Sequence, residues 1–200
     1  MFALACGVAA SIRAGLGVSP VSLLPYVAAE ITGASMGAAT AAVMALLVFA
    51  QALLLRRKFR LARLLQLVSS AVFGYFVDLA MLLFWQPDGR AVRAGLLLLG
   101  IFLIAAGIAA MMETGLAPLP FESMVAAVAE VTGRRFHAVK IAMDSAFAAS
   151  ALLLSLAFLG EARGLGAGTV LAALLVGRLL PPCARLLALA RRAGKQGGAA

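Results

Sequence analysis

Residues 15–33 read GLGVSPVSLLPYVAAEITG, and residues 115–133 read GLAPLPFESMVAAVAEVTG. The two stretches align without a gap at an offset of 100, and seven of their 19 positions are identical. The identities include a proline, a glutamate and a threonine, which are scarce in this chain, so biased composition explains them poorly. The sequence therefore predicts an internal duplication, with repeat units over 1–85 and 94–185.

Long apolar runs surround these two stretches. Of the 200 residues, 64% are hydrophobic and 12% are charged, about half the charged share of a soluble domain. Runs over 36–55 and 94–112 carry no charge, whereas 64–84 and 145–177 carry few, and the last is broken at 160–168. Because a spanning helix needs about 20 apolar residues, we expect an all-α bundle in the lipid bilayer. It would contain about six transmembrane helices plus two short re-entrant or half helices.

The short segments 19–33 and 118–132 decide the topology. Fifteen helical residues reach about 22 Å, whereas the hydrocarbon core is about 30 Å thick. If both segments span, lysine and arginine divide almost evenly between the two sides. If both re-enter, twelve basic residues collect on one side and four on the other. The positive-inside rule favours the second model.

Re-entry gives each repeat three spans, so the repeats are predicted to be inverted. Both termini would then be cytoplasmic, and residues 186–200 would form a basic cytoplasmic tail. The expected location is a bacterial cytoplasmic (inner) membrane.

A central site is predicted where the two short segments meet. Irregular backbone at membrane depth is tolerated only where it is buried in protein or lines a wet cavity. Inverted repeats with broken helices near the midplane are typical of transporters, and helix N-termini there favour anions. The predicted substrate- or ion-binding residues are Ser19, Pro20, Ser22, Pro120, Glu122, Ser123, Asp78, Asp144 and Arg178.

Each ionisable candidate also has a structural interpretation. Glu122 either carries a proton or cation, or is an ordinary acid in the first turn of a helix. Asp144 either belongs to the site, as intramembrane acids usually do, or pairs with Lys140 four residues earlier. Asp78 either functions or hydrates at the outer interface. Arg178 either balances an acid or substrate anion, or snorkels inward.

Polar residues outside the candidate site are expected to serve the fold. Glu30 and Glu130 recur in an A-E-(I/V)-T-G ending, which favours a shared capping or interface role. Gly33 and Gly133 are expected to adopt the left-handed conformation that ends a helix. Interhelical hydrogen bonds are predicted for Gln51, Gln66, Ser69, Ser70, Ser145 and Ser150.

Several other classes receive little support. The net charge is +9, but the basic residues lie between apolar runs without interleaved aromatic residues, so no nucleic-acid partner is expected. Cys6 and Cys183 form no CxxC pair, and His137 is the only histidine, so no metal site is expected. Motifs of nucleotide-binding enzymes and hydrolases are missing. We therefore expect no enzyme and no cofactor, and we leave a homo-oligomer open.

Three tracts carry a family resemblance. At 16–20, LGVSP, at 132–144, TGRRFHAVKIAMD, and at 168–177, GTVLAALLVG, the sequence resembles the YczE/YitT-like bacterial membrane proteins. The resemblance covers about residues 1–185 and implies a small, duplicated, multi-spanning protein without an established substrate. Similar sequences often continue LGVSP into an aromatic residue and an acid. Here Val21 and Ser22 follow, and the acid survives only in the second half, as Glu122 or nearby.

The predicted function is a secondary transporter or permease-like protein for a small solute, whose identity the sequence does not reveal. A substrate-capture subunit of a multi-component importer and a non-transporting membrane scaffold are the alternatives.

Overall fold

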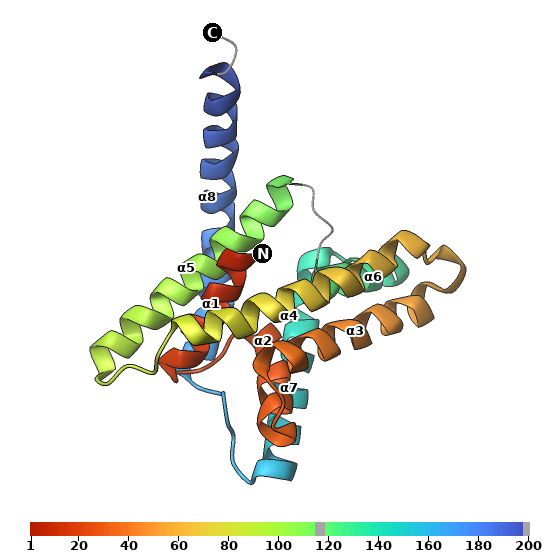
Figure 1. Cartoon of the computed structure of the whole chain (residues 1–200). Coiled ribbons are helices and arrows are strands. Elements are labelled where there is room, and N and C mark those ends of the chain that lie inside the picture. The colour runs from red at the N-terminus through yellow and green to blue at the C-terminus, as the bar shows by residue number, and fades with distance from the viewer. Residues whose placement is uncertain (115–118, 198–200) are drawn as a thin grey trace.

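The computed structural model describes residues 1–114 and 119–197, and the secondary structure of this part of the chain is entirely helical (Figure 1). The all-α prediction is therefore confirmed. Two 3-10 turns, Arg56–Lys58 and Leu61–Leu64, connect the third and fourth helices. The α-helices are α1 (Phe2–Ala14), α2 (Pro20–Thr32), α3 (Met36–Leu55), α4 (Leu65–Leu83), α5 (Arg90–Thr114), α6 (Pro120–Thr132), α7 (Phe136–Leu159) and α8 (Ala167–Gly197).

Five segments of the described chain are long and apolar enough to cross a membrane. They are Met36–Leu55, Leu61–Leu83, Arg90–Met112, Phe136–Leu159 and Ala167–Leu187. Helix α1 is apolar but has only 13 residues, so five of the about six predicted transmembrane helices meet this criterion.

Helices α2 and α6 are too short to cross. Each has 13 residues and is about 20 Å long, against a hydrocarbon core of about 30 Å. Each begins with a proline, which lacks the N–H that a first helical position leaves unpaired. Each ends at a left-handed glycine, Gly33 with φ 70° and Gly133 with φ 66°. The predicted glycine caps are confirmed.

Helices α1 and α5 cross at close range through glycines. A Cβ on Gly7 would lie 2.6 Å from the backbone nitrogen of Ile104, and a Cβ on Gly107 would lie 2.8 Å from Leu4. Glycine therefore allows the two backbones to approach each other at both points. Ile104 and Gly107 follow Leu4 and Gly7 by 100 positions, so the same contact occurs twice with the roles of the helices exchanged. Such exchange is typical of two repeats related by a two-fold axis.

The fourth helix of each half packs on the first helix of the same half. Ala80 of α4 lies in a buried cluster with two alanines of α1, and Cys183 of α8 lies in a buried cluster with two alanines of α5. The alanines are again 100 positions apart: Ala5 and Ala105, and Ala9 and Ala109.

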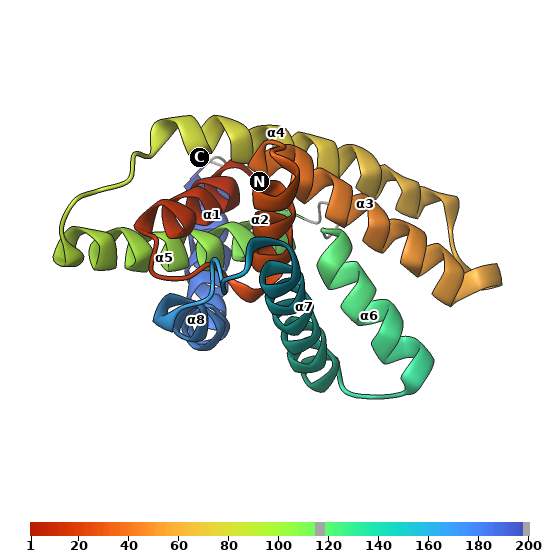
Figure 2. The same ribbon diagram turned by 90° about the horizontal axis from the view of Figure 1, so that it is seen from below.

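The short helices lie between the two halves. Helix α2 packs against α3 and α7, and α6 packs against α7 and α3. Seen from below, α2 lies beside α7, and α6 lies on the far side of α7 toward α3 (Figure 2). Each short helix therefore contacts the third helix of its own half and that of the other half.

The halves differ at one helix pair. Helix α4 packs along α3, where a Cβ on Gly74 would lie 2.5 Å from the carbonyl oxygen of Gly37. Within the described residues, α8 makes no comparable contact with α7. The position 100 residues after Gly37 is His137 and that after Gly74 is Leu174, so neither glycine of this contact recurs in the second half. Only 11% of the α7 and α8 spans is buried, against 39% and 33% for α3 and α4.

Candidate functional site

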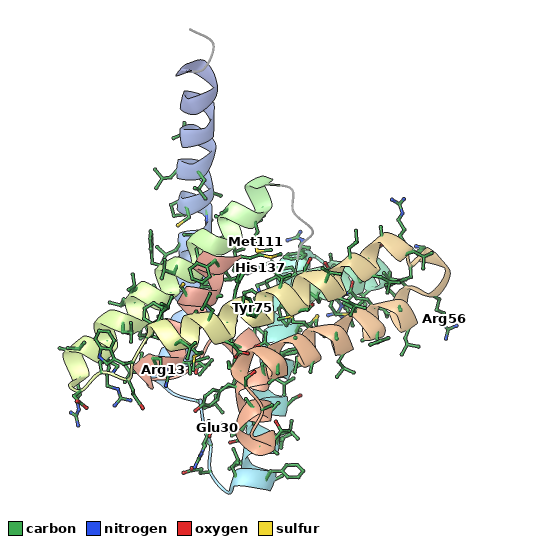
Figure 3. The ribbon with its side chains drawn as sticks, in the orientation of Figure 1. Arg13, Glu30, Arg56, Tyr75, Met111 and His137 are labelled. Carbon is green, nitrogen blue, oxygen red and sulfur yellow. The ribbon has the colours of Figure 1, made fainter. Side chains whose placement is uncertain are left out.

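Ion pairs attach the end of each short helix to the other half. Glu130 Oε1, near the end of α6, lies 3.5 Å from Nζ of Lys58 in the α3–α4 connection. Glu30 Oε2, near the end of α2, lies 2.7 Å from Nη1 of Arg163 in the α7–α8 connection. Arg163 also bonds Glu161, and its hydrogen bonds to Glu161 and Glu30 raise its pKa above the usual value, so it stays charged. The two repeated glutamates therefore make equivalent ion pairs. Figure 3 shows that Glu30 and the α3–α4 connection, marked there by Arg56, lie at different ends of the molecule.

These ion pairs bear on the membrane path of α6. Two long helices, α4 and α5, separate the α3–α4 connection from the start of α6. If both cross the membrane, the chain returns to the side of Lys58 before α6 begins. A complete crossing by α6 would then carry Glu130 to the opposite side from Lys58. The pair that joins Lys58 to Glu130 therefore favours re-entry of α6.

The first turns of α2 and α6 approach each other at the middle of the long helices. Phe121 lies in a buried cluster with Met44 and Leu47, at mid-length of α3, and Val21 of α2 packs against the same cluster. The ring of Phe121 also meets that of Phe147, at mid-length of α7, edge-on with 5.0 Å between centroids. The N-terminus of α6 is therefore buried at the middle of the long helices, and the half-buried first turn of α2 packs beside it.

Three charged residues gather beside this aromatic pair. Lys140 Nζ lies 3.3 Å from Oδ2 of Asp144 on the same face of α7 and 4.9 Å from the centroid of the Phe121 ring. Glu122, the residue after Phe121, lies within electrostatic range of both Lys140 and Asp144. Oε2 of Glu122 is buried and has no hydrogen-bond partner within the described residues. We call Phe121, Glu122, Lys140, Asp144 and Phe147 the acid–lysine cluster.

A buried glutamine positions the start of α6. Gln51 Nε2 donates to the carbonyl oxygen of Pro120 at 3.1 Å and to Oε1 of Gln66 at 3.3 Å. These bonds confirm the interhelical role predicted for Gln51 and Gln66. The same prediction was wrong for Ser69 and Ser70, whose hydroxyls donate to carbonyl oxygens four residues earlier in their own helix.

The first turn of α2 has polar groups but no charge. Ser19 precedes Pro20 and donates from Oγ to Oγ of Ser22 at 3.0 Å. In α6, Ser123 is buried like Phe121. Because the position equivalent to Glu122 is Ser22, the ionisable groups near the short-helix N-termini come from the second half alone.

Two predicted site residues lie apart from the acid–lysine cluster. Asp78 accepts hydrogen bonds from Ser35 Oγ and from the backbone N–H of Gly37, both at 2.6 Å, at the start of α3. Gly37 precedes Gln51 by 14 residues, about 21 Å along the helix, so Asp78 is far from the start of α6. Arg178 is exposed on α8, which packs on α5.

Sequence reasoning did not include Lys140 in the site. The signal was its position four residues before Asp144, which suggested only a local ion pair. Its contact with the ring of Phe121 depends on how α6 packs on α7 and could not be read from spacing.

Comparison with known proteins places the chain in a family. A family described as being of unknown function (DUF6198) matches residues 1–184. The chain belongs to this family. No curated protein and no solved structure matches it significantly.

Proposed function

We propose that the protein is a secondary transporter or permease for a small solute in the cytoplasmic membrane, with both termini cytoplasmic. The acid–lysine cluster would bind the solute or its coupling ion. The two short helices would enter the membrane from opposite sides, in the inverted arrangement that transporters use. Family membership leaves the substrate open, and the likeness to YczE/YitT-like proteins stays a resemblance.

The observation that carries this proposal is the buried carboxylate oxygen of Glu122. An ionised carboxylate is costly to bury without a partner, so the group needs a proton or a cation. Lys140 and Asp144 already pair with each other, and Glu122 has no ion-pair partner among the described residues. Intramembrane acids in this situation are typical of ion and proton pathways.

A transport assay in proteoliposomes tests the proposal. Purified protein would be reconstituted with a pH gradient or a sodium gradient, and uptake would be measured across a panel of labelled metabolites. We expect gradient-dependent uptake of at least one solute. Glu122→Gln should abolish the dependence on the gradient, whereas Asp88→Asn, a change at an exposed loop acid, should leave it unchanged. Uptake by Glu122→Gln that still follows the gradient would refute the coupling role.

A capture subunit of a larger importer is the second candidate. The sparse burial of the α7 and α8 spans favours it, because a partner protein would need a helix surface of this kind. Co-purification with an ATPase at fixed stoichiometry, together with transport only when the ATPase is present, would favour this candidate over the first. A scaffold predicts instead that the acid–lysine cluster can be replaced without loss of function.

A further inference from the structure

We infer that the acid–lysine cluster is a binding site for a small organic ammonium compound, and that the Lys140 side chain occupies this site when the ligand is absent. The inference deepens the proposed function and rests on it for the claim that the bound compound is transported. Binding itself can be measured on the purified protein.

The Lys140 ammonium group shows what the site accepts. Nζ lies 4.9 Å from the centre of the Phe121 ring, within the distance of about 6 Å at which a ring face attracts a cation. Nζ also lies 3.5 Å from Oδ1 and 3.3 Å from Oδ2 of Asp144. An aromatic face and a carboxylate are the two groups that recognise an ammonium ligand.

The charge of the cluster leaves room for a second cation. Glu122 and Asp144 carry two formal negative charges and Lys140 carries one positive charge. The buried oxygen of Glu122 has no hydrogen-bond partner among the residues the structure describes. Asp144 therefore becomes free to bind a ligand once Lys140 moves away, and Glu122 adds a second negative charge to the site.

The geometry also allows Lys140 to leave. Its side chain is 35% exposed and that of Asp144 is 25% exposed, and a lysine stem has four rotatable carbons. The ring of Phe121, in contrast, is fully buried and held edge-on by Phe147. Lys140 is therefore the group that can move, and the ring of Phe121 is the fixed surface that binds a cation.

Calorimetric titration of the purified protein in nanodiscs tests the inference. The probes are ethanolamine and choline, with the neutral analogues propan-1-ol and 3,3-dimethylbutan-1-ol as controls. We expect at least one ammonium probe to bind and its neutral analogue not to bind. If Lys140 fills the site about 90% of the time, Lys140→Met should tighten binding about tenfold.

Further variants separate the contributions. In the Lys140→Met protein, Phe121→Leu should weaken binding about fivefold, because it removes the ring face. Lys58→Met and Phe102→Leu are matched controls at exposed positions and should leave ammonium binding unchanged. Lys140→Gln replaces Lys140→Met if the latter unfolds at a lower temperature than the unaltered protein.

Defined outcomes overturn the inference. It is wrong if neither ammonium probe binds to the folded Lys140→Met and Lys140→Gln proteins, or if neutral analogues bind equally well. Ammonium binding by a protein that transports no solute would refute the proposed function and support the ammonium site. Coupled transport of a solute without an amine, together with no ammonium binding, would support the proposed function and refute the ammonium site.

Discussion

Asp78→Ala removes a carboxylate that accepts two hydrogen bonds at the start of α3. Ser35 Oγ and the Gly37 N–H each donate to it at 2.6 Å. A hydrogen bond to a charged group contributes about 1.5–3 kcal/mol, and the lower figure applies because both bonds are partly accessible to solvent. The loss is then about 3 kcal/mol. For a chain of this size, about 2–4 °C of Tm correspond to 1 kcal/mol, so we expect a decrease of about 6–12 °C.

Thermal unfolding in detergent, followed by circular dichroism, measures this change. Asp78→Asn keeps one carbonyl acceptor and should fall between Asp78→Ala and the unaltered protein. Asp88→Ala is the matched control, since Asp88 is an exposed loop residue. The capping role is refuted if Asp78→Ala lowers Tm no more than the control does. An unchanged Tm together with loss of solute transport would instead support a role for Asp78 in solute binding.

Three further predictions concern the architecture. Cysteines placed at Ala34 and Arg134, in a background without native cysteines, should react with an impermeant thiol reagent from opposite sides of the membrane; reaction from one side would refute re-entry. Gly7→Val should prevent stable folding or lower Tm by about 10 °C, because its Cβ would clash with the backbone of Ile104. A Tm equal to that of Gly95→Val, where the space is open, would contradict this close crossing. Exchanging the charges of Lys58 and Glu130 should restore whatever stability either single reversal removes, up to about 1 kcal/mol, as a double-mutant cycle would show.

Helix boundaries were predictable because their signals are local. The predicted apolar run over 36–55 coincides with α3, which Ser35 caps by accepting from the Ala38 N–H at 3.1 Å. Proline and glycine marked both ends of α2 and α6 in the same way.

The candidate site was only partly predictable because its signals are tertiary. Glu122 and Asp144 were expected in it from their charge within apolar surroundings. Asp78 satisfied the same criterion, but its partners are 41 and 43 residues away in sequence, so its capping role could not be read from local spacing. The contact between Lys140 and Phe121 likewise requires α6 to pack on α7.

The unequal packing of the halves has a consequence for how such a protein could evolve. In the first half, Gly37 and Gly74 allow α3 and α4 to pack closely as a hairpin. In the second half, α7 and α8 stand apart, and all the ionisable members of the acid–lysine cluster belong to that half. After a duplication, one copy can thus keep the close helix packing that stabilises the fold. The other copy is less closely packed, so its residues can change and acquire a binding site.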